Sequence, residues 1–392
     1  MQMPLEGIKV LDLSRLLPGP FCSMILGDLG AEVLKIEDTK HGDPFRTDQS
    51  VFKYEKTVFM MINRNKRSMK LNLGSDQGQA IIRQLAAEYD VLLEGFRPGV
   101  MAKLGLDYEQ LRHINPRLIY CSLTAYGQYG PYRDRPGHDL NTISLSGVLD
   151  AIGVRHGPPV IPGVQIGGIG GGAMWAAIAI LAALLGRGKD GPGQYLDAAI
   201  ADGLLPFHSM FAASYFAAGE VPQHGETEAS GACAYYNVYQ TQDGRYVSLG
   251  AAETKFWVGF CQAIGRPDLI AEQHAPEPRQ SQIINEVRAI MRSRTQSEWV
   301  ELLEPLDICF TPVNNLEEAL TDPQIQAREM VVEIDHPEEG RIPMVAFPVK
   351  FSATPARIKS PPPLYGQHSE EVLTGLGYTQ AQIEALHGLG VI

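Results

Sequence analysis

A histidine and an aspartate stand side by side in the sequence RPGHDLN, residues 135–141. The imidazole of His138 titrates near neutral pH, so it could remove a proton from a weakly acidic C–H bond or donate a hydrogen bond to a thioester oxygen. Gly137 precedes it and would allow a close approach of backbone or ligand. An aspartate that caps a helix, next to a histidine without a chemical role, would give the same letters. Both interpretations stay open from these residues alone.

Two groups of cationic residues suit a phosphate site. NRNKRS, residues 63–68, contains Arg64, Lys66 and Arg67, and Arg97 follows an apolar run in EGFRPG. The sequence DLSRLLPGPFC leads from a predicted strand into a helix N-terminus, where backbone N–H groups can bind an anion. A tight turn with a solvated basic loop, or an arginine paired with a surface acid, would look the same. The patterns G-x-G-x-x-G after the first strand and G-x-x-x-x-G-K-[ST] are both absent, which disfavours nicotinamide and P-loop sites.

Alternating strands and helices must position these residues. Apolar runs predict strands at 7–14, 31–37, 91–96 and 117–124, and helices are predicted between them, one of them capped by Ser75. This alternation predicts a parallel sheet covered by helices over roughly the first 200 residues.

The pattern of predicted strands and helices changes after about residue 225. Two β-rich runs flank Asp243-Gly244, which predicts a hairpin, and amphipathic helices follow. With 392 residues, the chain is long enough for two domains. We therefore expect an α/β protein with a large domain, residues 1–215 completed by 331–392, and a small α+β domain, residues 225–330.

Composition excludes several classes of protein. A formal net charge of −12 disfavours binding to nucleic acid or to an anionic membrane. The five cysteines are far apart and lack metal-site spacing, which suits a reducing compartment and predicts no metal. The N-terminus lacks the pattern of a signal peptide, and the longest apolar run, residues 173–185, is about as long as a buried core helix. We expect a cytoplasmic protein.

Several segments, taken in order, resemble one family. They are GIKVLDLSRLLPGPFCSMILGDLGAEVLKIE, NRNKRSMKLNL, DVLLEGFRPGVMAKLGL, NPRLIYCSLTAYGQYGP, GHDLNTISLSGVLDAIG, GGGAMWAAIAILAALL and GPGQYLDAAIADG. Over about residues 4–330 the chain resembles the family III CoA transferases of the CaiB/BaiF type, which include the α-methylacyl-CoA racemases. The resemblance implies a large domain of Rossmann-like topology, an interlocked dimer, and coenzyme A or an acyl-CoA as the ligand.

The resemblance also implies which residues contact CoA. These expected contacts are Leu17 and Pro18 at the entrance, Ile62, Asn63, Arg64 and Asn65 at the adenine and phosphate end, Gly95, Phe96, Arg97 and Lys103 beyond them, and Gly137 and Asn141 beside His138. Most relatives carry an arginine where this chain has Asp38, whose charge would repel phosphate. Lys35, Arg46 or Lys66 are therefore expected to compensate.

The resemblance assigns catalytic roles as well. The GHDLN sequence is similar to the racemase branch, which implies that His138 is one of two bases at the α-carbon of the acyl group. Glu253 matches a glutamate that family members place near this site across the dimer. An acid at a helix N-terminus, favoured by the helix dipole, explains Glu253 equally well.

The second catalytic group of the family is missing. Transferases and racemases carry an aspartate two positions before the glycine run, as nucleophile or as second base, and here that position is Gly168. Glycine can neither form a covalent intermediate nor take a proton. Asp139 lies next to His138 and Asp150 lies 18 positions before Gly168, but neither is a ready substitute from the sequence.

Three hypotheses follow from this loss. The chain is a subunit of a transferase that moves CoA between carboxylic acids, and a homologous partner supplies the aspartate. Alternatively, His138 alone serves an acyl-CoA racemase, epimerase or isomerase. In the third hypothesis the chain binds CoA without catalysis.

Overall fold

The computed structural model describes residues 2–46 and 57–392, which form two compact units. The first unit contains Met1–Ser146, Val164–Pro206 and Pro323–Ile392, and the second contains Gly147–Gly163 and Phe207–Asp322. These bounds differ from those expected for the two domains, because residues 147–163 belong with the second unit and the chain returns to the first unit at Pro323.

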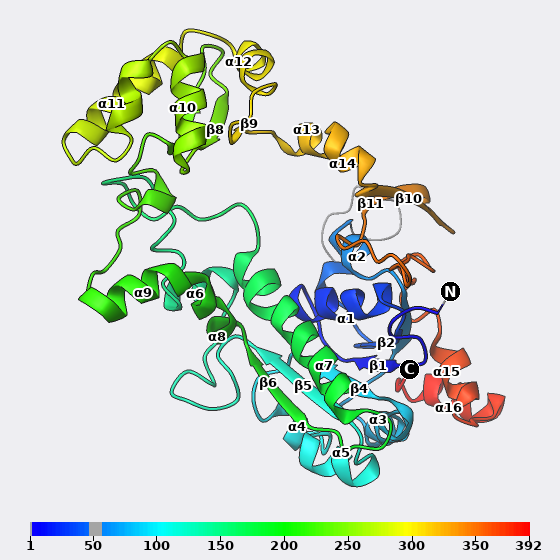
Figure 1. Ribbon diagram of the computed structural model, residues 1–392. Helices are drawn as coiled ribbons and strands as arrows, with labels where there is room; N and C mark the ends of the chain where they lie inside the picture. Colours follow the sequence, from blue (N-terminus) through cyan, green and yellow to red (C-terminus); the bar gives the residue numbers. More distant parts are fainter. Residues whose placement is uncertain (1, 47–56) are drawn as a thin grey trace. The chain divides into compact units, whose positions relative to one another are not determined.

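A six-stranded parallel sheet forms the centre of the first unit (Figure 1). Its strand order is β3-β2-β1-β4-β5-β6. The strands are β1 (Lys9–Asp12), β2 (Glu32–Glu37), β3 (Lys66–Lys70), β4 (Val91–Glu94), β5 (Ile119–Thr124) and β6 (Tyr195–Ala199). This is the Rossmann-like order, in which the direction of winding reverses between β1 and β4. The chain is an α/β protein, and the loops after β1 and β4 meet at the edge where such sheets bind ligands.

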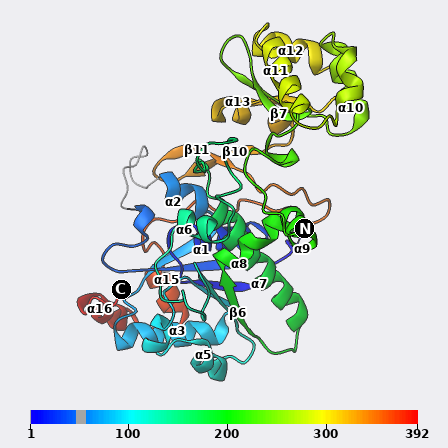
Figure 2. The same ribbon diagram turned by 90° about the vertical axis from the view of Figure 1, so that its left-hand side faces the viewer.

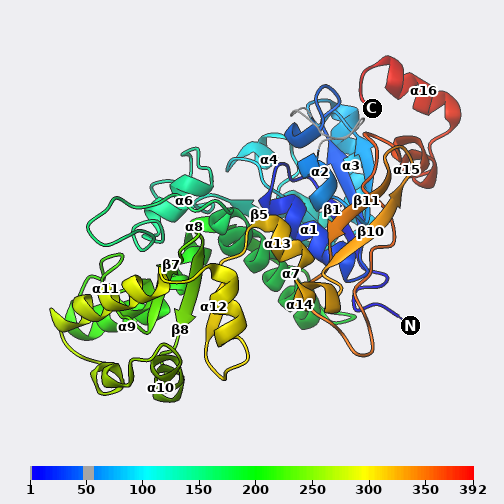
Figure 3. The same cartoon turned by 90° about the horizontal axis from the view of Figure 1, so that it is seen from above.

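Helices cover both faces of this sheet (Figure 2). On one face lie α1 (Pro18–Asp28) and α7 (Met174–Arg187). On the other, buried apolar side chains of the strands pack against α3 (Asp76–Glu88), α5 (Tyr108–Ile114), α15 (Ser369–Gly375) and α16 (Gln380–Gly388). Figure 3 shows the C-terminal pair α15 and α16 on the side of the sheet where α3 lies. The last residues of the chain thus complete the core of the first unit.

Short elements surround the sheet. They are η1 (Pro44–Arg46), α2 (Thr57–Ile62), α4 (Val100–Lys103), α6 (Asp139–Leu145), the π-helix η2 (Ile166–Ala173), α8 (Ile200–Leu204), α14 (Pro323–Ala327), and the antiparallel pair β10 (Val331–His336) and β11 (Gly340–Val345). The 3₁₀-helix η3 (Leu205–His208) lies where the chain passes into the second unit.

The second unit is an α+β structure around a three-stranded antiparallel sheet. Strands β7 (Tyr236–Gln240) and β8 (Tyr246–Gly250) form the predicted hairpin, in which Gly244 has a φ of 79°. Its other elements are α9 (Ser209–Ala218), η4 (Glu228–Ser230), α10 (Thr254–Ala263), η5 (Pro267–Glu272), α11 (Arg279–Met291), α12 (Gln296–Leu303), β9 (Phe310–Pro312) and α13 (Leu316–Thr321). Trp257 and Phe260 stack in its core.

The apolar helix after the glycine run is only partly a core helix. Together η2 and α7, Ile166–Arg187, are long and apolar enough to cross a membrane by length and composition, as core helices of soluble proteins also are. Ala176 and Ile180 are buried on the inner side of α7, but Ile178 is exposed and Leu185 is 85% exposed. The expectation of a buried core helix is therefore only half right, and α7 presents an uncovered apolar face.

Candidate active site

Two arginines follow the strands at the point where the winding of the sheet reverses. Arg15 comes after β1 and Arg97 after β4, and both are exposed. The guanidinium carbon of Arg15 lies 5.1 Å from the centre of the Phe96 ring, so the two loops contact each other. The sequence interpretation singled out Arg97 and missed Arg15, although both are cations directly after a predicted strand.

The loop after β1 leads straight into the N-terminus of α1. Leu17 is the N-cap residue and Pro18 the first helical residue, where its missing N–H costs nothing. A side chain at Gly19 would have its Cβ 2.2 Å from Ser14, so only glycine fits there. Leu17 and Pro18 are half-buried at the same edge of the sheet as Arg15. Because Pro18 and Pro20 have no N–H and the N–H of Phe21 donates to the carbonyl oxygen of Leu17, the group at this edge that best suits an anionic ligand is the guanidinium of Arg15.

The cations expected to compensate Asp38 are used inside the protein. Lys35 pairs with Asp43 at 2.9 Å, and Lys66 Nζ lies 3.4 Å from Asp12; all four side chains are fully buried. Burial lowers the pKa of Lys66 to about 8, and Asp12 opposes part of that change. Arg46 binds Glu37 through Nε at 2.7 Å. The side chains of Lys35 and Lys66 are thus paired with acids inside the protein, and a compensation of Asp38 by these residues stays a prediction.

Asp12 holds these buried charges in place. Burial alone would raise its pKa, but Lys35 and Lys66 hold the pKa of Asp12 below its usual range. Its carboxylate also accepts hydrogen bonds from the hydroxyls of Ser14 and Ser23. The network lies under the loop after β1 and fixes its path into α1.

The predicted adenine and phosphate contacts are buried as well. Arg64 donates to Asp28 through Nε at 2.9 Å and through Nη2 at 2.7 Å, and to the carbonyl oxygen of Val345 at 2.7 Å. Asn65 Nδ2 donates to Asp28 at 2.8 Å, and its Oδ1 accepts the N–H of Lys359. These side chains fasten the C-terminal segment to α1. A CoA contact by Ile62, Asn63, Arg64 or Asn65 stays a prediction, and these internal bonds already occupy the polar side chains of Arg64 and Asn65.

A buried glutamate supports the turn after β4. Glu94 is 3% exposed; one carboxylate oxygen accepts the N–H of Phe96 at 2.7 Å and the other accepts the hydroxyl of Ser122. Burial raises the pKa of Glu94 to about 7, although these two hydrogen bonds oppose the shift. Sequence reasoning missed Glu94, because a lone acid at the end of a strand gives no signal. Gly95, Arg97 and Lys103 are exposed around it.

Asp139 and Gly168 contact each other although 29 positions separate them, and His138 directly precedes Asp139. His138 is exposed and is the N-cap residue of α6, and the side chain of Asn141 accepts its backbone N–H at 3.0 Å. Asp139 Oδ1 accepts the backbone N–H of Gly168 at 2.6 Å. The sequence offered no ready substitute for the missing carboxylate, yet a carboxylate lies directly against that position.

Gly137 and Gly168 differ in the space around them. A Cβ at Gly137 would lie 2.8 Å from Ala125, so the chain approaches too closely there for a side chain. A Cβ at Gly168 would lie 3.4 Å from Leu17 and 3.6 Å from Asp139 Oδ1, which are ordinary contacts. The missing side chain at Gly168 is therefore not a steric requirement of the fold.

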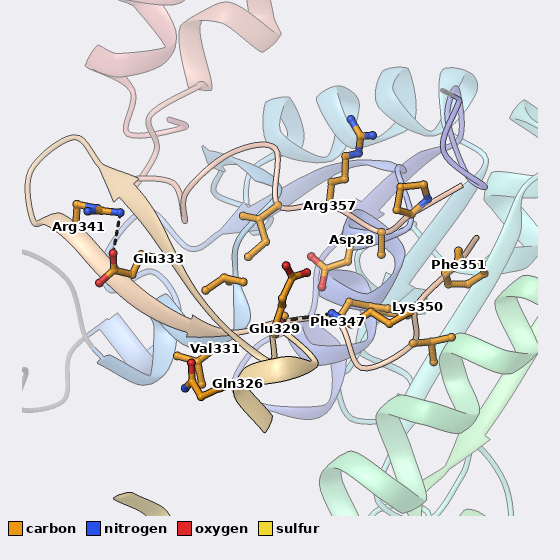
Figure 4. A pocket seen from close by; sticks show the side chains of 16 residues that line it. Asp28, Gln326, Glu329, Val331, Glu333, Arg341, Phe347, Lys350, Phe351 and Arg357 are labelled. Carbon is orange, nitrogen blue, oxygen red and sulfur yellow. Dashed lines mark hydrogen bonds and ion pairs between the residues drawn. The ribbon is translucent and has the colours of Figure 1, made fainter. Parts of the chain in front are cut away.

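A large cavity elsewhere in the first unit is made of other residues. It has a volume of about 690 Å³ and lies among β10, β11 and the segment 346–358. In Figure 4, Arg341 pairs with Glu333 and Lys350 reaches the backbone oxygen of Glu329. None of the predicted site residues lines it. Among the residues that the structure describes, no group of three His, Cys, Asp or Glu side chains could hold a metal ion.

Comparison with known proteins identifies the chain. The family model described as CoA-transferase family III matches residues 5–369. The chain belongs to CoA-transferase family III. Human succinyl-CoA:glutarate CoA-transferase is 35% identical over 396 residues, which cover 99% of this chain and 90% of the relative. The beta subunit of succinyl-CoA–L-malate CoA-transferase from Chloroflexus aurantiacus is 34% identical over 399 residues, covering 100% of this chain and 98% of the relative.

Structures and racemases agree with this assignment. A CaiB/BaiF family protein from Brucella suis has a TM-score of 0.83 at 30% identity, covering 96% of this chain and 100% of the other. Human α-methylacyl-CoA racemase matches over a similar length. The expected family, the α/β fold and the transferase class are therefore confirmed. Acyl-CoA is the ligand that membership of the family implies.

Glu253 lies in the second unit of this family III member. It is the exposed N-cap residue of α10, and its backbone oxygen accepts the N–H groups of Phe256 and Trp257. This is the helix-terminal position that its alternative interpretation describes. Its place near His138 across a dimer stays a prediction.

Proposed function

We propose that this family III member binds an acyl-CoA at the edge of the sheet after β1 and β4 and takes part in moving CoA between carboxylic acids. Three features support this. Arg15 and Arg97 offer two exposed cations beside the N-terminus of α1, which suits the phosphates of CoA. The exposed imidazole of His138 and the carboxylate of Asp139 stand at the N-terminus of α6. The named relatives act on succinyl-CoA together with glutarate or malate.

We further propose that the chain works as one subunit of the transferase and that a homologous partner supplies the catalytic aspartate. The observation that carries this proposal is Gly168, which stands beside Asp139 and Leu17 with room for a side chain but has none. The relative from Chloroflexus aurantiacus is itself named as a beta subunit, which agrees with a divided enzyme. The uncovered apolar face of α7, with Met174, Trp175 and Ile178, offers a surface for a second chain.

The partner's carboxylate would carry the acyl group and the CoA in turn. It attacks the thioester carbonyl carbon, and CoA leaves as a thiolate while a mixed anhydride forms. The thiolate then attacks the carboxyl carbon of the partner's aspartate, which releases the first acid and leaves a thioester on the enzyme. The acceptor carboxylate attacks this thioester, and the released thiolate finally attacks the acceptor's acyl carbon. The aspartate is regenerated, so every bond broken is matched by one formed.

The experiment compares the chain alone with the chain and its partner. The protein is purified from its natural source, and chains that travel with it are identified by mass spectrometry. CoA exchange from succinyl-CoA to glutarate or malate is then followed by liquid chromatography for the chain alone, the partner alone and the mixture. We expect CoA binding but negligible exchange by the chain alone, and exchange in the mixture. Full exchange by the chain alone would refute the divided enzyme.

A second candidate is favoured by the contact between Asp139 and Gly168. His138 and Asp139 could act together on the α-carbon of an acyl-CoA, as a racemase, epimerase or isomerase without a partner. The chain alone would then exchange the α-hydrogen of 2-methylacyl-CoA for deuterium, and both His138→Ala and Asp139→Asn would abolish the exchange. Tight CoA binding without any turnover, alone or in a mixture, would instead indicate a binding protein.

A further inference from the structure

Glu94 is a buried acid that accepts hydrogen bonds from the turn after β4, which belongs to the proposed CoA site, and from Ser122 on β5. It ends β4, and the next three residues, Gly95, Phe96 and Arg97, form the turn that is expected to contact CoA. Its carboxylate accepts the backbone N–H of Phe96 at 2.7 Å, across the first bend of that turn. The ring of Phe96 in turn lies 5.1 Å from the guanidinium carbon of Arg15. One carboxylate therefore connects the turns that carry both exposed arginines.

The surroundings leave Glu94 room to change. A cavity of about 110 Å³ lies beside it, lined by residues of α4, α5, β5 and β6. Gln128 also lines this cavity, and its buried Nε2 atom has no hydrogen-bond partner among the described residues. The charged or titratable groups that line the cavity or act on Glu94 are Arg97, Asp107, Tyr108, Tyr120, Tyr195 and Asp197.

These neighbours do not neutralise Glu94. Burial is the largest influence on its pKa and raises it to about 7, and the negative charge of Asp197 adds to the rise. The hydrogen bonds from Ser122 and Phe96 lower it only in part. Both protonation states of Glu94 are therefore populated near neutral pH.

We propose that Glu94 is a positioning residue, whose ionised carboxylate holds the Gly95–Arg97 turn in the form that binds CoA and whose protonation loosens this turn. An ionised acceptor binds an N–H more strongly than a neutral carboxyl group does. Protonation also makes the carboxyl group a donor, so its bond with Ser122 must reverse or break. The turn then loses this support, and the backbone that carries Arg97 is held less firmly.

The effect on CoA is a loss of affinity at acidic pH. The hydrogen bond to the ionised carboxylate is stronger than the bond to the neutral carboxyl group. This difference in free energy corresponds to about a fivefold change in the affinity for CoA between the two protonation states. Repulsion between the carboxylate and the CoA phosphates would instead weaken binding as the pH rises. The direction of the pH dependence therefore distinguishes this repulsion from the proposed support of the turn. The inference rests on the proposed CoA site, because it assumes that the turn after β4 contacts the ligand.

The test is calorimetric titration of the full chain with CoA and with dephospho-CoA at pH 6, 7 and 8. Dephospho-CoA lacks the 3′-phosphate, whose own titration near pH 6 would otherwise add to the pH dependence. Glu94→Gln keeps the shape and a neutral acceptor, so it represents the protonated state at every pH. Glu109→Gln, an exposed change on α5, is the control for the loss of one negative charge.

The unmodified chain and Glu109→Gln should bind dephospho-CoA about threefold more tightly at pH 8 than at pH 6, because about a tenth of Glu94 is in the minority protonation state at each of these pH values. Glu94→Gln should bind it at all three values as weakly as the unmodified chain does at pH 6. If Glu94→Gln bound dephospho-CoA at pH 8 as tightly as the unmodified chain does, or more tightly, the inference would be overturned. It would also be overturned if the affinity of Glu94→Gln still depended on pH. If no variant binds either ligand, the proposed CoA site itself is wrong and the inference fails with it.

Discussion

Replacing Gly168 by aspartate should let this chain transfer CoA without a partner. The position accepts a side chain, because a Cβ there would lie 3.4 Å from Leu17 and 3.6 Å from Asp139 Oδ1, both ordinary contacts. Gly168 is also part of a helix with φ outside the left-handed region, so an L-residue brings no backbone strain. Exchanging glycine for another residue in a helix should, if anything, add a few tenths of a kcal/mol of stability.

The neighbouring acid sets the electrostatics of the new carboxyl group. Its oxygens would stand about 4–5 Å from those of Asp139, and two charges at this distance repel by about 3–4 kcal/mol at an effective dielectric constant of about 20. This corresponds to a rise of about 2–3 units in the pKa of the new carboxyl group. Gly168→Asp should therefore be most active at neutral or higher pH. The double variant Gly168→Asp/Asp139→Asn should extend the activity to lower pH.

The assay is the exchange of CoA from succinyl-CoA to a panel of carboxylic acids, followed by liquid chromatography. Gly168→Asp alone should exceed the unmodified chain by on the order of 10²-fold or more, since it adds a group that takes part in every bond change. Gly168→Asn has nearly the same shape without a nucleophile and should stay inactive. A Gly168→Asp variant that folds and binds CoA but transfers nothing would refute the reasoning. Equal activity of Gly168→Asn would do so as well.

Three further predictions follow from other contacts. Burial raises the pKa of Glu94 to about 7 in the folded protein, against 4.5 ordinarily, so its contribution to the free energy of unfolding should fall by about 3 kcal/mol as the pH rises from about 4 to 8. Urea titrations at several pH values should show this decrease for the unmodified chain but not for Glu94→Gln. Arg97→Ala should weaken CoA binding about tenfold by calorimetry, while Arg112→Ala on exposed α5 should not. Asp28→Ala leaves a buried charge on Arg64 and should lower the free energy of unfolding by about 3–5 kcal/mol; a loss under 1 kcal/mol would contradict the ion pair's role.

The sheet could be predicted from the sequence because its signal is local. The four predicted strands β1, β2, β4 and β5 contain short apolar runs that are largely buried, and α3 begins at a clear cap, Ser75. The strands β3 and β6, with the sequences KRSMK and YLDAA, lack this signal and were not predicted. The alternation of elements predicts that neighbouring strands are parallel, whereas the reversal between β1 and β4 was expected only from the family resemblance. The placement of 147–163 with the second unit had no such local signal.

The polar residues of the site could be predicted only where their partners are near in sequence. The run NRNKRS looks like a solvated basic loop, yet Arg64 binds Asp28 and Val345, which lie 36 and 281 positions away. The approach of Asp139 to Gly168 spans 29 positions and depends on how α6 packs against η2. Whether a cation is available to a ligand is decided by such distant partners, which a single sequence does not reveal.

The division between buried and exposed cations bears directly on how CoA would be held. Lys35, Lys66 and Arg64 neutralise buried acids under the loops, so their charges are already used inside the protein. Only Arg15 and Arg97 among these cations are exposed at the edge where β1 and β4 end. Two cations cannot neutralise all the phosphates of CoA. Much of the affinity should therefore come from apolar contact, and it should depend only moderately on salt.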